Sequence, residues 1–363
     1  MPPVLLILPF FLALTTASHL PKRAICTVPS LADPAKDDVP AIHAALQQCG
    51  DTGRILMPLN NTYTIRSPLD LSPCRACDFQ INGVLNVSDA YAYWQTQPYV
   101  IKAPNTTAAV IRSDGNTGVI DGNNCGYSAA LKGASTYSRA PPLVSVLDSS
   151  YVLVFSGLTV KNVPGTAFYI NNSTGIRFHS IAFEGGSSAA AVGYVVDAAR
   201  HVYVWNSTIR AREGCVRVLT NSSNVQVEES TCIIDAAGSG NVDLQPSGIS
   251  FYLSPSLLGR RLEWIRNVWV KSTKFVGEMD AVAFVPGGEG TVEVFNATFT
   301  DVEVGGGVKE AVRVYWEDGV KYNVSKVLLR DWTGTAKETS EFRCQADDIC
   351  DFVKEGWDVV EGA

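Results

Sequence analysis

The phrases "SSYVLVFSGLTVKN" (149–162), "STGIRFHSIAFEG" (173–185), "ARHVYVWNSTIRA" (199–211) and "SSNVQVEESTCII" (222–234) decide the fold of this chain. Each combines a strand rich in Val, Ile, Phe or Tyr, a small polar bend and a second strand. A fifth phrase of this kind, "GTVEVFNATFTDV", occupies 290–302. The first four phrases begin 24, 26 and 23 residues apart. That interval is the length of one coil of a parallel β-helix, in which neighbouring coils bury each other's apolar side chains.

An antiparallel β-sandwich also contains many short strands. A sandwich does not need one strand-bend-strand phrase at a fixed period, so the repeat favours the β-helix. No linker or composition shift divides the chain, and we predict one all-β domain, a right-handed parallel β-helix over 24–363. Further β segments extend the pattern, at Tyr63–Ile65, Phe79–Leu85, Ala109–Ile111, Gly118–Ile120, Leu262–Val270 and Val324–Leu329.

One helix is predicted, over Asp37–Cys49. Asp37 or Asp38 is a suitable N-cap, Pro40 suits the first turn, and the apolar residues that follow share one face. Arg54–Pro58 then begins the first strand. We interpret the helix as a lid on the end of the solenoid, because an open sheet end invites pairing with other chains.

The first residues indicate export from the cell. Val4–Leu14 is apolar apart from Pro9, and residues 1–18 resemble a signal peptide. The run is shorter than the roughly 20 residues that span a bilayer. Residues 19–23 end in Lys22-Arg23, which looks like a dibasic propeptide site of the fungal secretory type. We therefore expect a secreted, extracellular protein.

Cysteines and glycosylation sequons agree with that compartment. Eight of the nine cysteines form close pairs, which predict the disulfides Cys26–Cys49, Cys74–Cys77, Cys215–Cys232 and Cys344–Cys350. Cys125 is left over, as a buried free thiol or as a functional or intermolecular one. N-glycosylation sequons begin at Asn60, Asn86, Asn105, Asn171, Asn172, Asn206, Asn221, Asn296 and Asn323.

The composition excludes several classes of function. The net charge of −7 argues against a nucleic-acid or anionic-membrane partner. With 46% hydrophobic and 18% charged residues, the chain has enough apolar side chains to form a hydrophobic core, and its composition does not indicate disorder. The four histidines are dispersed, and no P-loop or dinucleotide fingerprint occurs. We expect no metal, no cofactor and a monomer.

A series of phrases along the chain points to one known family. They are "CTVPSL", "DDVPAIHAALQQCG", "LDLSPCRACDFQINGVLNVSD", Tyr93-Trp94, "GVIDGN", "VYVWNSTI", "GCVRV", "NVQVEESTC" and "VAFVPGG". In these phrases the chain resembles fungal members of glycoside hydrolase family 28, the polygalacturonases and their exo-acting and xylogalacturonan-cleaving relatives. The resemblance covers essentially the whole mature chain and implies a right-handed parallel β-helix with a substrate groove along one face.

The resemblance also implies which positions bear the chemistry. The family has an Asn-Thr-Asp motif, an Asp-Asp pair before a cysteine, a Gly-His-Gly and a later lysine, which suit inverting hydrolysis by an acid and a base. Counted from Cys215, the first motif falls on Ala190-Ala-Val192-Gly193, and the acid pair falls on Glu213-Gly214. The histidine position falls near Ala236 and the lysine position on Ala283. Each lost acid or base costs roughly 10²–10⁴ in rate, so pectin cleavage by the usual mechanism is not expected.

Small or apolar residues at these positions favour a repurposed groove, which binds a polysaccharide or small-molecule ligand or hosts cyclase- or isomerase-type chemistry. Glu213 would then be the proton donor or acceptor, with a pKa raised by an apolar setting, or else an ordinary solvated turn residue. Arg210, Arg212 and Arg217 would contact an anionic ligand, or alternate on a solvated face.

Two alternatives stay open. A surviving glycosidase of pectic polysaccharide would pair Glu213 with Asp235 or Asp243, and Asp197 and Asp280 are weaker candidates. As plain loop residues these carboxylates need no function. A passive glycan-binding or host-interaction protein would stack sugars on exposed tryptophans, although tryptophan is more often part of the buried structure. The candidates are Trp94, Trp205, Trp264 and Trp316.

Overall fold

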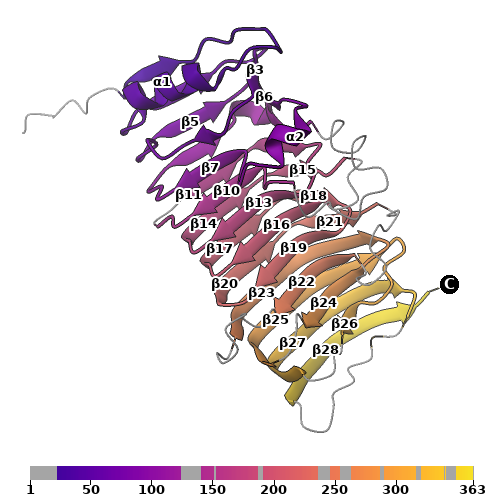
Figure 1. The fold of residues 1–363 in the computed structure, drawn as a ribbon. Coiled ribbons are helices and arrows are strands. Elements are labelled where there is room, and N and C mark those ends of the chain that lie inside the picture. Colours follow the sequence, from indigo (N-terminus) through magenta and orange to yellow (C-terminus); the bar gives the residue numbers. More distant parts are fainter. Residues whose placement is uncertain are drawn as a thin grey trace, which may run out of the picture.

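The chain forms a right-handed parallel β-helix (Figure 1). The computed structural model describes residues 23–123, 140–150, 153–186, 191–235, 246–253, 263–286, 290–315, 320–338, 340 and 349–362. All pairings between strands in these ranges are parallel, and strands of successive coils lie side by side. The predicted fold class is therefore confirmed. The signal segment 1–18 and nearly all of 19–23 lie outside the described residues.

Two sheets form the wall of the helix. The larger sheet has 19 strands, and most coils contribute two of them on either side of a bend. Its strands are β1 (Ile25–Thr27), β2 (Arg54–Met57), β3 (Thr62–Ile65), β5 (Asp78–Ile81), β6 (Val84–Val87), β8 (Val110–Arg112), β9 (Gly118–Asp121), β11 (Leu153–Ser156), β12 (Leu158–Lys161), β14 (Thr174–His179), β15 (Ala182–Glu184), β17 (Arg200–Trp205), β18 (Thr208–Ala211), β20 (Ser222–Glu228), β21 (Thr231–Ile234), β23 (Glu263–Gly277), β25 (Gly290–Gly305), β27 (Val320–Ala336) and β28 (Ile349–Glu361).

The smaller sheet has nine strands and supplies the third side of each coil. Its strands are β4 (Leu69–Asp70), β7 (Ile101–Pro104), β10 (Val144–Leu147), β13 (Thr166–Asn171), β16 (Val192–Asp197), β19 (Gly214–Leu219), β22 (Ser247–Leu253), β24 (Asp280–Pro286) and β26 (Val312–Val314). The strand-bend-strand phrase omits this third strand, so the prediction of two strands per coil was incomplete.

Between β18 and β19 the chain bends at Arg212-Glu213. Two local predictions were wrong. Phe79–Leu85 is two strands, because the chain bends at Gly83, where a Cβ atom would lie 2.3 Å from the Asn61 carbonyl oxygen. The first strand is β1, which precedes the helix and pairs with β2.

The core consists of side chains that stack from coil to coil. Phe155 of β11 and Phe178 of β14 lie in register with ring centroids 5.1 Å apart. Further on, Phe251 of β22 stacks on Phe284 of β24 at 4.8 Å. All four rings are buried. Apolar burial of this kind contributes about 25 cal/mol per Å², so the repeating interior stabilises each coil against the next.

Helix α1 (Val39–Cys49) covers the first coil, as predicted (Figure 1). Asp38 does not cap it through its side chain. Its carboxylate instead accepts hydrogen bonds from the backbone amides of Leu31 and Thr64, each at 2.7 Å, and so ties the lid to β3. The disulfide Cys26–Cys49 joins α1 to β1. The other described helices are α2 (Tyr91–Trp94) and the 3-10 helix η1 (Asp114–Asn116), and none of the three is long and apolar enough to span a membrane.

The disulfides Cys74–Cys77 and Cys215–Cys232 are also formed. Cys350 is disulfide-bonded, while its predicted partner Cys344 lies outside the described residues, as does Cys125.

An asparagine ladder runs across the strands β20, β23 and β25 of the larger sheet. Asn224, Asn267 and Asn296 occupy equivalent positions in three successive coils, each with a φ between 55° and 60°. The Asn267 Nδ2 donates to Asn224 Oδ1 at 3.2 Å, and the Asn296 Nδ2 donates to Asn267 Oδ1 at 2.8 Å. Asparagine suits both tasks, since it tolerates this left-handed conformation and its amide both donates and accepts.

The substitution Asn267→Ala should lower the free energy of unfolding by about 2 kcal/mol, because it removes two half-buried hydrogen bonds and strains the backbone. Urea unfolding measures the loss. Asn105→Ala is the matched control, since Asn105 has a φ of 49° but is exposed and outside the ladder. Equal losses in the two variants would show that the ladder contributes nothing.

Candidate functional site

The outer face of the smaller sheet carries two rows of side chains. In β19, Cys215, Val216 and Val218 all belong to the core. Because the successive residues Cys215 and Val216 both point inward, the alternation is interrupted between them, and Gly214 and Arg217 belong to the opposite face. Parallel register then aligns equivalent residues of successive coils. The first row is Val192, Gly214, Ser247 and Asp280, and the second is Tyr169, Val195, Arg217, Ser250, Ala283 and Arg313.

Three of the positions inferred from the family motifs lie on this face. Val192 of β16, Gly214 of β19 and Ala283 of β24 are all buried. Ser247 is the residue stacked on Gly214 in the next coil. Ala190, Ala236 and Asp243 lie outside the described residues, so their places are not assigned.

Glu213 lies in the bend before β19 and has a polar setting. Its Oε1 accepts a hydrogen bond from Arg217 Nη2 at 2.7 Å, and its side chain is 38% exposed. The Arg217 guanidinium also lies over the ring of Tyr252, 5.1 Å from the centroid. Glu213 therefore forms an ion pair with Arg217 and does not have the apolar surroundings that were hypothesised for it.

The three predicted arginine contacts do not converge. Arg210, on the larger sheet, pairs with Asp235 at 2.7 Å, and both side chains are exposed. Arg212 donates from Nε to the Gly186 carbonyl at 3.2 Å. Only Arg217 lies on the outer face of the smaller sheet. Asp197 also lies there, where it accepts a 2.6 Å hydrogen bond from the Tyr169 hydroxyl.

A second cluster, of which only Asp280 was named from the sequence as a weaker candidate, lies three coils beyond Arg217. Arg313 of β26 has its guanidinium 4.6 Å from the ring centroid of Tyr315. Its Nη1 lies 3.2 Å from Glu310 Oε1 and 3.9 Å from Asp280 Oδ2. The Tyr315 hydroxyl donates to Asp280 Oδ2 at 2.7 Å. A repeated phrase could have revealed it, since Ala311–Tyr315 reads AVRVY where Cys215–Leu219 reads CVRVL.

The two carboxyl groups of this cluster favour protonation. Burial raises the pKa of Asp280, whose side chain has no exposed area, although the Tyr315 hydrogen bond and Arg313 act against it. Burial, followed by the charge of Asp280, raises the pKa of Glu310 to about 7. A carboxyl group that is partly protonated near neutral pH can donate a proton.

Unsatisfied polar atoms gather on the same face. In the described part of the chain, four buried side-chain polar atoms lack a hydrogen-bond partner: Tyr194 Oη, Arg217 Nε, Asp280 Oδ1 and Arg313 Nη1. Three of the four belong to the two arginine clusters. Arg313 Nη1 still has its ion pair with Glu310, and the three atoms mark this face as a region of buried polar side chains.

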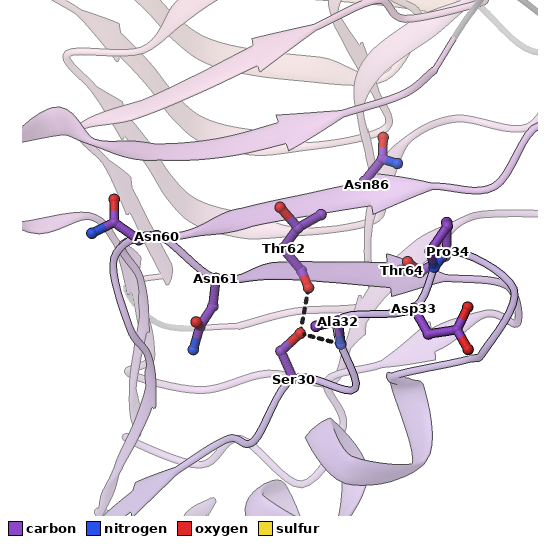
Figure 2. Close-up of a pocket in the computed structure, with 9 residues that line it drawn as sticks. All are labelled: Ser30, Ala32, Asp33, Pro34, Asn60, Asn61, Thr62, Thr64 and Asn86. Carbon is purple, nitrogen blue, oxygen red and sulfur yellow. Dashed lines mark hydrogen bonds between the residues drawn. The ribbon is translucent and has the colours of Figure 1, made fainter.

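A pocket of about 300 Å³ lies elsewhere, beside the first coils (Figure 2). The segment Ser30–Pro34 and strands β3 and β6 surround it, and Ser30 Oγ donates to the Thr62 carbonyl. The sequon residues Asn60 and Asn86 line it. Asp33 is the one carboxylate among its lining residues, so the pocket lacks the pair of carboxylates that glycoside hydrolysis needs. No cluster of metal-binding side chains occurs in the described ranges.

Comparison with known proteins places the fold and face in context. The family model for glycosyl hydrolases family 28 matches residues 49–350. The chain belongs to glycoside hydrolase family 28. Endo-xylogalacturonan hydrolase A of Aspergillus tubingensis is 27% identical over 94% of this chain and 86% of its own length. A probable endo-xylogalacturonan hydrolase A of Aspergillus fumigatus is 30% identical over 79% of this chain and 69% of its own.

Solved structures of the family have the same fold. The crystal structure of the Aspergillus tubingensis endo-xylogalacturonan hydrolase matches with a TM-score of 0.78 and 26% identity, over 93% of this chain and 92% of that one. An exopolygalacturonase from Thermotoga maritima matches with a TM-score of 0.69 at 13% identity, over 93% of this chain and 88% of that one, and shows the fold alone. As a family 28 protein, this chain retains the predicted solenoid over nearly its full length.

The substitution Glu310→Gln should stabilise the protein at about pH 8 by roughly 2–3 kcal/mol and have little effect at about pH 4. The pKa of Glu310 is about 7 in the folded protein, against an ordinary value of 4.5. Between these values the folded state binds the proton more tightly than the unfolded state, so the native protein loses stability as the pH rises. Glutamine keeps the shape without the charge.

Thermal unfolding across this pH range tests the effect. Glu355→Gln is the control, because Glu355 lies in an exposed pair with Arg330. A Glu310→Gln variant with the pH dependence of the native protein would contradict the expectation.

Proposed function

We propose that the outer face of the smaller sheet binds an anionic pectic sugar chain through Arg217 and Arg313, without the paired acids of the family's usual hydrolysis. The observation that carries this proposal is the alignment of Arg217 and Arg313 in one row of this face, where the two side chains are 23% and 28% exposed. Carboxylates accept hydrogen bonds from a guanidinium fork in fixed geometry, and each galacturonate unit of pectin offers one.

The placement of the two arginines supports this ligand class. The second row runs Arg217, Ser250, Ala283, Arg313, so three coil spacings separate the arginines. At about 4.8 Å per spacing the backbones are roughly 14 Å apart, which a short oligosaccharide spans. A tyrosine ring beneath each guanidinium holds it in place.

The remaining carboxylates of the face support binding rather than the usual hydrolysis. Glu213 is paired with Arg217, and Asp280 is wholly buried and accepts from Tyr315. Val192, Gly214 and Ala283 supply no acid, base or cation at the motif positions. If the bound ligand undergoes chemistry, a cyclase- or isomerase-type proton transfer needs only one such group, and Glu310 is better placed for it than Glu213.

A second candidate function is a divergent glycosidase of pectic polysaccharide. The raised pKa values of Asp280 and Glu310 favour it, because glycoside hydrolysis needs a carboxylic acid that stays protonated near neutral pH. The names of the Aspergillus relatives point to xylogalacturonan as the substrate to test.

We also propose that the protein is secreted. The signal-like residues 1–18, the sequons and the three described disulfides support an oxidising, extracellular compartment. There, polysaccharide rather than nucleic acid or membrane is the available partner.

Calorimetric titration with a galacturonic acid oligomer tests the binding site. Arg217→Ala and Arg313→Ala should each raise the Kd about tenfold, because each removes charge-assisted hydrogen bonds. The Kd of the Arg217→Lys variant should lie between those of the native protein and of Arg217→Ala, since lysine keeps the positive charge but lacks the planar guanidinium that binds a carboxylate with two hydrogen bonds. Arg330→Ala, in an exposed pair on the larger sheet, is the matched control. An unchanged Kd in both arginine-to-alanine variants would overturn the proposal.

Reducing-end release from polygalacturonate and xylogalacturonan separates the two functions. We expect no turnover by the purified mature protein. Turnover that Glu310→Gln or Asp280→Asn abolishes would establish the glycosidase in its place. Turnover abolished by Glu213→Gln would assign the reaction to the carboxylate first inferred from the sequence.

A further inference from the structure

Two large aromatic side chains are exposed on the larger sheet, on a different side of the solenoid from the two arginine clusters. Trp205 of β17 is 46% exposed and Trp269 of β23 is 36% exposed. By contrast, Trp94 is fully buried, so its suggested role in stacking sugars was wrong. Trp264 is half-buried, and Trp316 lies outside the described residues.

The two tryptophans belong to a regular grid, here called the Trp platform. Parallel register over β14, β17, β20 and β23 gives two adjacent rows of four side chains. Tryptophan occurs in the second and fourth coils, and polar residues fill the coil between them. The rows are Arg177, Tyr203, Gln226, Trp269 and His179, Trp205, Glu228, Lys271.

Neighbouring side chains hold the Trp205 ring in place. Its Nε1 donates to Glu229 Oε2 at 2.8 Å, and the His179 ring lies against it with centroids 4.6 Å apart. Both contacts come from neighbouring coils. An exposed ring fixed in this way loses little side-chain entropy when a ligand stacks on it.

The platform carries two cations that form no ion pair. Arg177 and Lys271 take part in no ion pair with the described residues, and Arg177 lies over the Tyr203 ring at 5.8 Å. The nearby carboxylates are held by neutral donors, since Glu229 accepts from Trp205 and Glu228 accepts from Gln226 at 2.5 Å. The two cations therefore balance the two carboxylates in number, and they lie at opposite corners of the grid, where they are available to carboxylates of a ligand.

We propose that the Trp platform is a second carbohydrate-binding surface, which takes an anionic polysaccharide of the uronic acid type. Two coil spacings of about 4.8 Å separate the tryptophan strands, so the backbones lie roughly 10 Å apart. A sugar chain laid across the coils stacks one ring on each tryptophan, and the polar coil between them meets its hydroxyl groups. Arg177 and Lys271 then meet its carboxylates at either end.

This surface does not depend on the arginine clusters, because the two sites lie on different sheets. It would hold the protein on polymeric substrate while the smaller sheet engages another segment or chain. Two linked sites of this kind raise the apparent affinity for a polymer more than for a short oligomer.

Affinity electrophoresis in native gels that contain polygalacturonate tests the platform. The measurement uses full-length mature protein with Arg217→Ala and Arg313→Ala already in place, so the other site does not contribute. Adding Trp205→Ala and Trp269→Ala should raise the Kd for the polymer at least about tenfold. Adding Arg177→Ala and Lys271→Ala instead should weaken binding and flatten its salt dependence.

Val353→Ala is the matched control, because Val353 is 44% exposed and lies on the same face in the row of Trp269. It should leave the Kd unchanged. Retardation that survives loss of both tryptophans would overturn the proposal, as would equal retardation by dextran, a neutral polymer. A dimer in light scattering that disappears with the tryptophans would also overturn it, since the platform would then bind a second copy of the chain.

Discussion

Coil-to-coil register is the constraint on which the rest of this structure depends. Each coil forms parallel main-chain hydrogen bonds with the coil before it, so a residue lies directly above its equivalent in the preceding turn. Inside, this alignment stacks Phe155 on Phe178 and Phe251 on Phe284. In β20, β23 and β25 the same alignment joins three asparagines into a hydrogen-bonded ladder. The same alignment that repeats the core therefore also repeats the surface.

That repetition lets one solenoid carry two separate faces. Along strands such as β17 and β18, side chains alternate in and out, so the core takes about every second residue and leaves the others for ligands. On the smaller sheet, the second row of the outer face places Arg217 and Arg313 at equivalent positions of different coils. On the larger sheet, an equivalent arrangement places Trp205 and Trp269 within one grid. Both faces run along the coils, which suits an elongated sugar chain better than a compact ligand.

The cluster around Arg313 contains buried ionisable groups that lower the stability of the folded protein. Burial raises the pKa of both Asp280 and Glu310, and one oxygen of Asp280 has no hydrogen-bond partner. Tyr315 and Arg313 offset this only in part. Buried ionisable groups of this kind weaken a folded state and are typical of functional sites. Asp280 occurs here at the end of the row that also contains Val192 and Gly214.

The sequence by itself determined the solenoid, its approximate period, the lid helix and the three described disulfides, because each depends on a local pattern or short spacing. It did not reveal the smaller sheet. Strand β16 is buried at five of six positions, so it lacks the alternation that made β17 recognisable. Only the tertiary structure decided which residues meet. Gly214, Ser247 and Asp280 are about 30 residues apart in sequence and become neighbours through register. Glu213 was predictable from its place before Cys215, whereas Arg313, Glu310 and Trp269 acquire their partners only when the coils stack.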